Sequence, residues 1–303
     1  MARSKLILAE LSHTGDGRSP NTVPLAAGYL AAAVKQYCAG WDVSIYRDPQ
    51  LLLNELRREP PDILGLSLKH WSEEISSFVA KAMREINDGT LVVVGGPSVP
   101  DDDGELARFL LRHREFQIAI PNEGENGLIA LCQYLRIPFG FSSWLKSGDT
   151  IQGCAWLERE ELVRGAYMSP LLSGLPSPYL TGVLDEFLRD GYEPVIQSMR
   201  GCPYQCQFCV SAKKNWSVRA FDLIRVYGEL EYIEARTSSP YLILTDENFG
   251  LLKERDVQLA RGIKEMSSQG WPRKLYHYSA KIVTPEVKEL VETLGDLGEF
   301  GIS

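Results

Sequence analysis

Long apolar stretches are missing from the sequence. Apolar runs such as "LILA" and "LVVV" are only a few residues long, whereas a helix that spans a bilayer needs about 20 apolar residues. The basic start "MARSK" leads into a brief apolar stretch that soon turns polar, which predicts a buried strand rather than a signal peptide. We therefore expect a cytoplasmic protein without a transmembrane segment.

An excess of positive charge is also missing. The 32 lysines and arginines are outnumbered by 40 aspartates and glutamates, so the net charge is −8. This balance argues against a nucleic acid as partner, because general binding to nucleic acids rests on neutralising phosphates. The basic segment "SAKKNWSVR" at 211–219 is interpreted as a solvated or anion-facing loop.

Cysteine is scarce and unevenly placed. The chain has six cysteines in 303 residues, which is unlike the disulfide framework of a small secreted domain. Three of the six fall within the eight positions 202–209. Thiols gathered in this way in a reducing compartment indicate a metal centre.

Strand-like and helix-like segments alternate through the first 140 residues. The expected strands are 5–11, 41–47, 62–68, 90–96 and 116–120, and the expected helices are 23–37, 49–59, 73–86, 104–113 and 124–135. Such alternation is typical of an α/β fold built on a doubly wound parallel sheet. We therefore assign residues 1–140 to a Rossmann-like domain.

The pattern changes after residue 140 and resumes near residue 191. Between them, a hairpin at 147–165 and a Pro/Gly/Ser-rich connection at 169–182 predict a linker over 141–190. Strands are then expected at 193–199, 240–246, 274–280 and 299–303, and helices at 220–236, 254–269 and 284–295. This (β/α) series over 191–303 is of barrel type, and the sequence ends within its fourth strand. We expect a truncated, open-sided barrel with weak or absent catalysis; the alternative is a minimal barrel completed by a partner chain or by dimerisation.

The three clustered cysteines have the spacing C-x-x-x-C-x-x-C. Cys202, Cys206 and Cys209 follow a predicted strand, and Gly201 and Pro203 shape the turn. Three thiolates from one loop can hold three corners of a cubane iron–sulfur cluster and leave one iron without a protein ligand. Structural zinc usually takes four ligands in two short pairs, and no second pair occurs here. Incidental buried thiols are the remaining alternative.

The segment "RGCPYQCQFC" resembles the signature of radical S-adenosylmethionine (SAM) enzymes. The resemblance implies a [4Fe–4S] cluster whose open iron chelates SAM, and reductive cleavage of SAM to a 5′-deoxyadenosyl radical. It places Phe208 against the adenine, although ordinary core filling is the plain alternative. It places Asp246 and Glu247 near the SAM amino group, although they equally fit helix N-capping. Ser279 and Ser303, at the ends of later strands, are predicted to face the barrel mouth.

The first domain resembles the cobalamin (B12)-binding domain that precedes the barrel in one large group of these enzymes. The resemblance rests on "PLAAGYLAA", "VVVGGPSVP" and "NEGEN", and a doubly wound sheet binds ligands beyond the carboxyl ends of its strands. It implies these cobalamin contacts: Ser12, His13, Thr14, Ser67, Gly95, Gly96, Glu123, Gly124 and Glu125. For the glycine pair, a tight turn is the alternative. A D-x-H-x-x-G motif is absent, so we expect cobalamin without a histidine ligand from the protein.

These resemblances predict a cobalamin-dependent radical SAM enzyme. The expected reaction is methyl transfer through methylcobalamin to an unactivated carbon, or phosphorus, of a small-molecule or lipid-like substrate, with flavodoxin or ferredoxin as electron donor. The alternatives are a cobalamin-dependent radical cyclisation or rearrangement without methylation, or a non-catalytic module that binds cobalamin or a cluster.

Overall fold

The chain folds into two compact units. The computed structural model describes residues 4–13, 21–135, 148, 150–204, 206–207, 209, 217–279 and 283–301. The first unit comprises residues 1–20 and 26–178, and the second comprises residues 21–25 and 179–303. The boundaries at 140 and 190 expected from the sequence concern domains rather than these units, and they stay predictions.

The first unit is built on a seven-stranded sheet in the order β2-β1-β3-β4-β5-β6-β7. Its strands are β1 (Ser4–Ala9), β2 (Trp41–Tyr46), β3 (Ile63–Ser67), β4 (Leu91–Gly95), β5 (Ile118–Ile120), β6 (Ala155–Glu158) and β7 (Glu161–Arg164). The first five pair in parallel, whereas β6 and β7 are antiparallel. The order crosses from β2-β1 to β3-β4-β5, which confirms the doubly wound topology.

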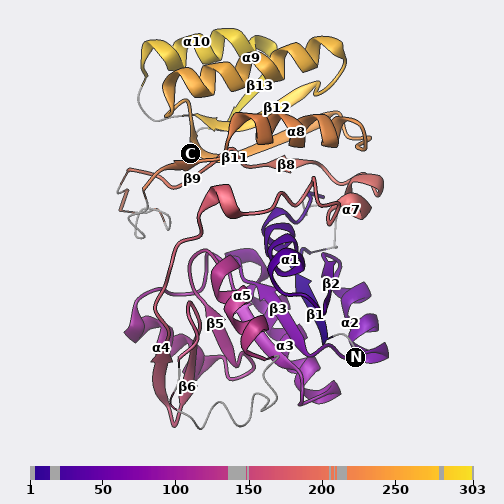
Figure 1. The fold of residues 1–303 in the computed structure, drawn as a ribbon, viewed down its shortest axis with the longest axis vertical. Coiled ribbons are helices and arrows are strands. Elements are labelled where there is room, and N and C mark those ends of the chain that lie inside the picture. The colour runs from indigo at the N-terminus through magenta and orange to yellow at the C-terminus, as the bar shows by residue number, and fades with distance from the viewer. Residues whose placement is uncertain are drawn as a thin grey trace. The chain divides into compact units, whose positions relative to one another are not determined.

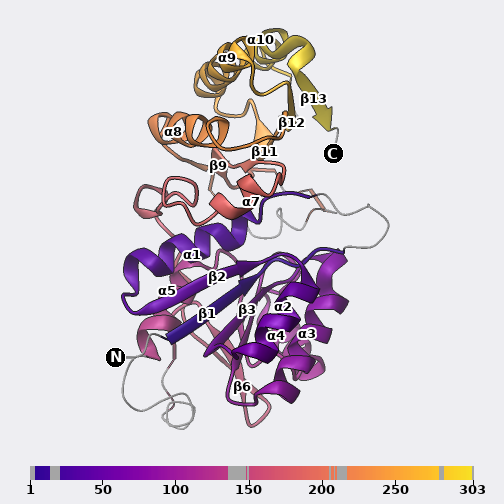
Figure 2. The ribbon, with the colours of Figure 1, turned by 90° about the vertical axis from the view of Figure 1, so that its right-hand side faces the viewer.

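Helices cover both faces of this sheet, as Figure 2 shows, with α1 and α5 on one side and α2, α3 and α4 on the other. They are α1 (Leu25–Tyr37), α2 (Pro49–Arg58), α3 (Glu73–Ile86), α4 (Asp103–Arg112) and α5 (Glu125–Tyr134), with short 3-10 turns η1 (His70–Ser72) and η2 (Leu172–Gly174). Strands such as β4, all apolar up to its last residue, are buried because both faces are covered. The main core cluster joins the sheet to α2, α3 and α4 through residues such as Leu52, Val79 and Leu106.

The hairpin expected in the linker belongs to the first sheet. β6 pairs with β5 through Ala119 and Ala155, and β7 then pairs with β6. The guanidinium of Arg164, at the end of β7, donates to the backbone carbonyl of Asp101 at 2.6 Å. It also donates to the carboxylates of Asp101 and Asp103. These contacts fasten the hairpin to the loop that begins α4.

The second unit is built on a four-stranded parallel sheet in the order β8-β11-β12-β13. Its elements are α7 (Asp185–Arg189), β8 (Val195–Ile196), β9 (Met199–Arg200), β10 (Arg219–Ala220), α8 (Leu223–Glu234), β11 (Tyr241–Phe249), α9 (Lys253–Gln269), β12 (Lys274–Ser279), α10 (Pro285–Leu294), η4 (Gly295–Leu297) and β13 (Gly298–Gly301). Strands neighbouring in sequence also neighbour in the sheet, as in a barrel wall. Figure 1 shows α8, α9 and α10 along this sheet. The described strands form no closed barrel.

Helix starts in both units are fixed by side chains that accept from free backbone N–H groups. Asp48 caps α2, Asp102 caps α4, Asp222 caps α8 and Thr284 caps α10. Among the described residues, none of the helices combines the length and apolar character that crossing a bilayer would require.

Candidate functional site

The loop that carries the three clustered cysteines is closed at its root. β9 and β10 pair antiparallel through Arg200 with Arg219 and Met199 with Ala220, so the two ends of the cysteine loop lie side by side. Gly201 opens the loop with φ of +96°, a conformation that side-chain-bearing residues rarely adopt. The backbone therefore turns sharply at the position where the sequence predicted it.

Within this loop the three cysteines differ in exposure. Cys202 is buried, whereas Cys206 and Cys209 are half-buried, and the Cys209 N–H donates to the Cys206 carbonyl at 3.0 Å. In the described residues, no group of three His, Cys, Asp or Glu side chains is gathered closely enough to hold a metal. The fold thus supplies three thiols on one tethered loop, and their convergence would accompany metal binding, as is common for metal sites.

Asn248 on β11 contacts the first cysteine. Its side chain is fully buried, and its Nδ2 donates to Cys202 Sγ at 3.0 Å. Within the described part of the chain, its Oδ1 is buried without a hydrogen-bond partner. A buried acceptor left unpaired is costly. The amide therefore presents an open acceptor beside Cys202.

Asp246, two residues earlier on β11, holds the strand that leads into the cysteine loop. Its carboxylate accepts from the backbone N–H groups of Ser198 at 2.7 Å and Met199 at 3.0 Å, and from the Ser198 hydroxyl. Burial raises the pKa of Asp246 from 3.8 to about 7, against the lowering effect of these hydrogen bonds. The geometry gives Asp246 a positioning role; its predicted contact with SAM stays a prediction.

Arg255, at the start of α9, braces the same corner. Its guanidinium donates to the carbonyls of Ser198 and Phe221, each at 2.9 Å, and pairs with Asp256 at 2.9 Å. The buried Asp256 in turn accepts from the backbone N–H groups of Gly250 and Leu252. The corner between β8 and β9 and the segment after β11 are therefore locked into one hydrogen-bonded unit.

The other residues predicted to contact SAM do not share the position of Asp246 beside the cysteine loop, or lie outside the described residues. Glu247 is exposed, on the opposite side of β11 from Asp246 and Asn248, because successive residues of a strand alternate in direction. Ser279 is the last residue of β12 and pairs in register with Phe249. Phe208 and Ser303 lie outside the described residues. All four assignments stay predictions.

The predicted cobalamin contacts gather at one edge of the first sheet. Ser12 and His13 follow β1, Ser67 ends β3, Gly95 ends β4, and Glu123 follows β5. Ser67 pairs with Gly95, and Gly95 with Ile120, so these strand ends are neighbours. Parallel strands bring their carboxyl ends to the same edge, where doubly wound folds bind ligands. Thr14 lies outside the described residues.

Loop contacts at this edge occupy some of the predicted side chains. His13 is exposed, and its Nε2 lies 2.6 Å from the Trp71 carbonyl. Glu123 accepts from Ser169 Oγ at 2.8 Å and Tyr167 at 3.3 Å. Trp71, which the sequence reasoning did not single out, is 62% exposed with the Lys69 ammonium over its ring. An exposed indole at a predicted ligand edge offers a flat apolar contact.

The two positions at the end of β4 that carry glycine differ in how strictly they require it. A Cβ at Gly96 would lie 2.6 Å from the Leu68 carbonyl oxygen and 2.9 Å from its nitrogen, and φ is +106°. A Cβ at Gly95 would lie 3.2 Å from the Ile120 carbonyl oxygen, without a positive φ. The close approach of β3 to β4 thus requires glycine at 96 whatever the ligand. Gly124 N-caps α5, and Glu125 begins that helix and is buried.

Cys38, Cys132 and Cys154 are buried in the first unit. Burial raises the pKa of Cys154 to about 12, and a hydrogen bond with Cys38 together with burial raises the pKa of Cys132. A protonated, enclosed thiol is a poor nucleophile and metal ligand. We assign these cysteines to the core.

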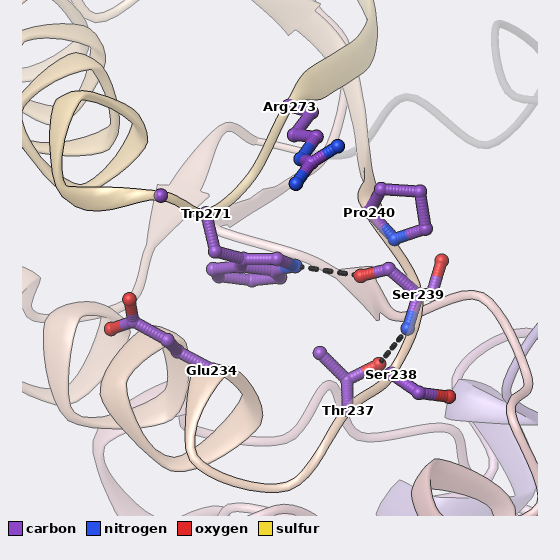
Figure 3. A pocket seen from close by; sticks show the side chains of 8 residues that line it. Glu234, Thr237, Ser238, Ser239, Pro240, Trp271 and Arg273 are labelled. Carbon is purple, nitrogen blue, oxygen red and sulfur yellow. Dashed lines mark hydrogen bonds between the residues drawn. The ribbon is translucent and has the colours of Figure 1, made fainter.

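A pocket of about 400 Å³ in the second unit (Figure 3) has none of the three clustered cysteines among its described lining residues. Its lining includes Ser239, Trp271 and Arg273, and the Trp271 indole donates to the Ser239 carbonyl at 2.9 Å. These residues precede β11 and β12, at their amino ends, whereas barrel chemistry collects at the carboxyl ends. The pocket is therefore not the candidate active site.

We expect Asp246 to make the second unit more stable in acid than above neutrality. Its pKa is about 7 in the fold and 3.8 when unperturbed, so the stability it contributes is present below pH 3.8 and is lost as the pH rises through 7. Between pH 5 and pH 8 the free energy of unfolding should fall by roughly 3 kcal/mol relative to the isosteric Asp246→Asn variant. Urea unfolding of both proteins at the two pH values measures the difference, and equal pH dependence would contradict the expectation.

Two curated relatives align with most of the chain. The 2-(S-pantetheinyl)-carbapenam-3-carboxylate methyltransferase of Streptantibioticus cattleyicolor is 31% identical over 299 residues, which is 90% of this chain and 41% of the relative. The cobalamin-dependent radical SAM methyltransferase TokK of Streptomyces tokunonensis is 30% identical over 292 residues, with the same two shares. The chain therefore spans about two fifths of the length of these relatives. No protein-family model matches it.

Among solved structures, the radical SAM methyltransferase TsrM of Kitasatospora setae, with cobalamin and a [4Fe–4S] cluster bound, superposes with a TM-score of 0.69. The match covers 97% of this chain and 57% of TsrM at 18% identity. At that identity the likeness concerns the fold, and it confirms the predicted order of a doubly wound sheet followed by a barrel-type (β/α) unit.

Proposed function

The chain belongs to the family of radical SAM enzymes that contain a cobalamin-binding domain, and on this premise we propose that it serves methyl transfer to an unactivated carbon, or phosphorus. The observation that carries the proposal is the tethered loop with Cys202, Cys206 and Cys209, whose root is fixed by Asp246 and Arg255. The likeness to two methyltransferases over 90% of the chain supports the reaction type.

The residues at the loop fit a [4Fe–4S] cluster with one open iron. Three cysteine thiols on one loop are the donor set that such a cluster uses. The Asn248 amide directs an N–H at Cys202 Sγ, and its Oδ1, which has no partner among the described residues, would offer an acceptor to a ligand of the cluster. When bound, the cluster supplies the electron that cleaves SAM, and cobalamin carries the methyl group.

The carboxyl edge of the first sheet fits a large flat ligand such as cobalamin. Small residues, Ser67 and Gly95, stand side by side at the strand ends, and Trp71 offers an exposed ring. His13 Nε2 lies 2.6 Å from the Trp71 carbonyl, which leaves Nδ1 as the other ring nitrogen, and binding without a histidine ligand from the protein stays a prediction. These contacts hold and orient the ligand rather than react with it.

The chain's own residues therefore position the cysteine loop and the ligands that it would hold. Asp246 accepts from the Ser198 N–H and Arg255 donates to the Ser198 carbonyl, so both hold the β8–β9 corner at the same residue. Fixing this corner sets where the buried Cys202 lies. Holding reactants in one geometry and excluding water are the protein's main contributions in cofactor chemistry.

The substrate we propose is a small molecule or lipid-like compound, and the electron donor a flavodoxin or ferredoxin in the cytoplasm. The named carbapenam substrate of one relative supports the small-molecule class. The cluster accepts one electron at a time, which requires a one-electron donor. Thiols that bind a metal must stay reduced, and a reducing compartment keeps them so.

The test measures the fate of SAM. The full chain, reconstituted anaerobically with iron, sulfide and hydroxocobalamin, is mixed with SAM and dithionite, and the products are quantified by mass spectrometry. We expect 5′-deoxyadenosine together with S-adenosylhomocysteine, the latter limited by the amount of cobalamin because the mixture holds no other methyl acceptor. Formation of 5′-deoxyadenosine alone would favour cyclisation or rearrangement, and formation of neither would favour a non-catalytic module.

A further inference from the structure

The Asn248 side chain occupies a position that folding of β11 alone does not explain. It is fully buried in the second unit, on the side of the strand that also carries the apolar Leu244 and the hydrogen-bonded Asp246. An apolar residue at 248 would avoid burying an amide whose Oδ1 has no partner among the described residues. The amide therefore has a use that offsets this cost.

Among the described residues, the Asn248 side chain hydrogen-bonds to a sulfur. Asn248 Nδ2 lies 3.0 Å from Cys202 Sγ. A thiolate accepts hydrogen bonds and donates none, so the amide orientation with the N–H group toward the sulfur is the favourable one. The donor sits on a strand rather than a loop, and Asp246, two residues before it, anchors the same cysteine segment at Ser198 and Met199. The contact is therefore held in place before any metal arrives.

We propose that Asn248 is a positioning residue that raises the reduction potential of the cluster through its N–H···S hydrogen bond to Cys202. This inference rests on the proposed function. Hydrogen bonds to the sulfurs are among the features that set cluster potentials, and second-shell donors orient and tune metal ligands. Reduction adds one electron to the cluster and places more negative charge on its sulfurs. A fixed N–H dipole therefore stabilises the reduced state more than the oxidised state.

The test compares the cluster potential of the wild type with those of Asn248→Leu and Asn248→Asp. Leucine keeps the branching at Cγ and removes the donor; aspartate removes the donor and adds a negative charge. The potentials are measured in a redox titration followed by electron paramagnetic resonance. We expect the equilibrium constant for reduction of the cluster to be about tenfold lower in Asn248→Leu than in the wild type, which lowers the potential by about 59 mV for a one-electron couple. Asn248→Asp should fall further. Unchanged potentials, or a rise in either variant, would overturn the inference.

A second measurement keeps the inference testable if the variants lose their cluster. In wild-type protein labelled with ¹⁵N at asparagine only, pulsed electron paramagnetic resonance of the reduced cluster should show a weak nitrogen coupling. Its absence would overturn the inference even if no variant can be titrated. If the wild type itself holds no cluster, the proposed function fails instead, so the two failures are distinguishable.

Discussion

Replacing any one of Cys202, Cys206 and Cys209 by alanine should abolish the iron–sulfur cluster. The wild type, reconstituted anaerobically, is expected to hold about four irons and four sulfides per chain, and each variant close to none. The reason is geometric: all three thiols come from one loop tied at its root by β9 and β10, so removal of one leaves only two thiols within reach. Iron and sulfide analysis with the visible absorbance of the cluster measures the loss, and formation of 5′-deoxyadenosine should fall to background with it.

The remaining cysteines provide the matched controls. Cys38, Cys132 and Cys154 are buried in the first unit, and burial raises the pKa of the Cys154 thiol. Alanine at any of the three should leave the iron content unchanged. A cluster that survives loss of Cys202, Cys206 and Cys209 together, or that is lost with Cys154→Ala in a folded protein, would contradict this assignment.

Much of the fold follows from local pattern. Short apolar runs separated by amphipathic segments predicted β1 to β5 and the helices between them, because strands buried on both faces are nearly all apolar. The hairpin β6–β7 could not be placed in the same way. Its position depends on pairing of Ala155 with Ala119 and on Arg164 reaching Asp101, contacts between residues far apart in the sequence. Local periodicity predicts that a hairpin forms, but not the sheet that it joins.

The candidate site, too, could be predicted from the sequence only in part. Cysteines at a distinctive spacing are visible in any sequence, and they were predicted. Asn248 and Arg255 were missed, because asparagine and arginine are common and their roles depend on which backbone and sulfur atoms they reach. One signal was available: in "LTDENFG" the polar residues Asp246 and Asn248 lie two apart on a buried strand, and so share a face. The predicted pair Asp246 and Glu247 lies on opposite faces of the strand, and the contact of each with SAM stays a prediction.

Replacing Gly96 by alanine should destabilise the protein much more than replacing its neighbour Gly95. Gly96→Ala is expected to cost about 3 kcal/mol or more of folding free energy, because φ of +106° strains any residue with a side chain and the new Cβ would meet the Leu68 backbone at 2.6 Å. That clash cannot be relieved by rotating a side chain, since Leu68 is held by its own bonds: its N–H to the Gly95 carbonyl at 2.6 Å and its carbonyl to the Ser98 N–H at 3.2 Å. The carboxyl ends of β3 and β4 must move apart, and hydroxocobalamin affinity should fall at least tenfold with them.

Gly95→Ala is the matched control. Its Cβ would meet only the Ile120 carbonyl oxygen, at 3.2 Å, on a backbone that tolerates alanine, so the change in stability should stay within about 1 kcal/mol in either direction. Urea unfolding and hydroxocobalamin titration of the full chain, followed by absorbance, measure both effects. If Gly95→Ala weakens hydroxocobalamin binding while stability is nearly unchanged, the ligand itself approaches the β4 end, as the proposed cobalamin site requires. Equal stability of the two variants would show that the approach of β3 to β4 does not set the requirement for glycine at 96.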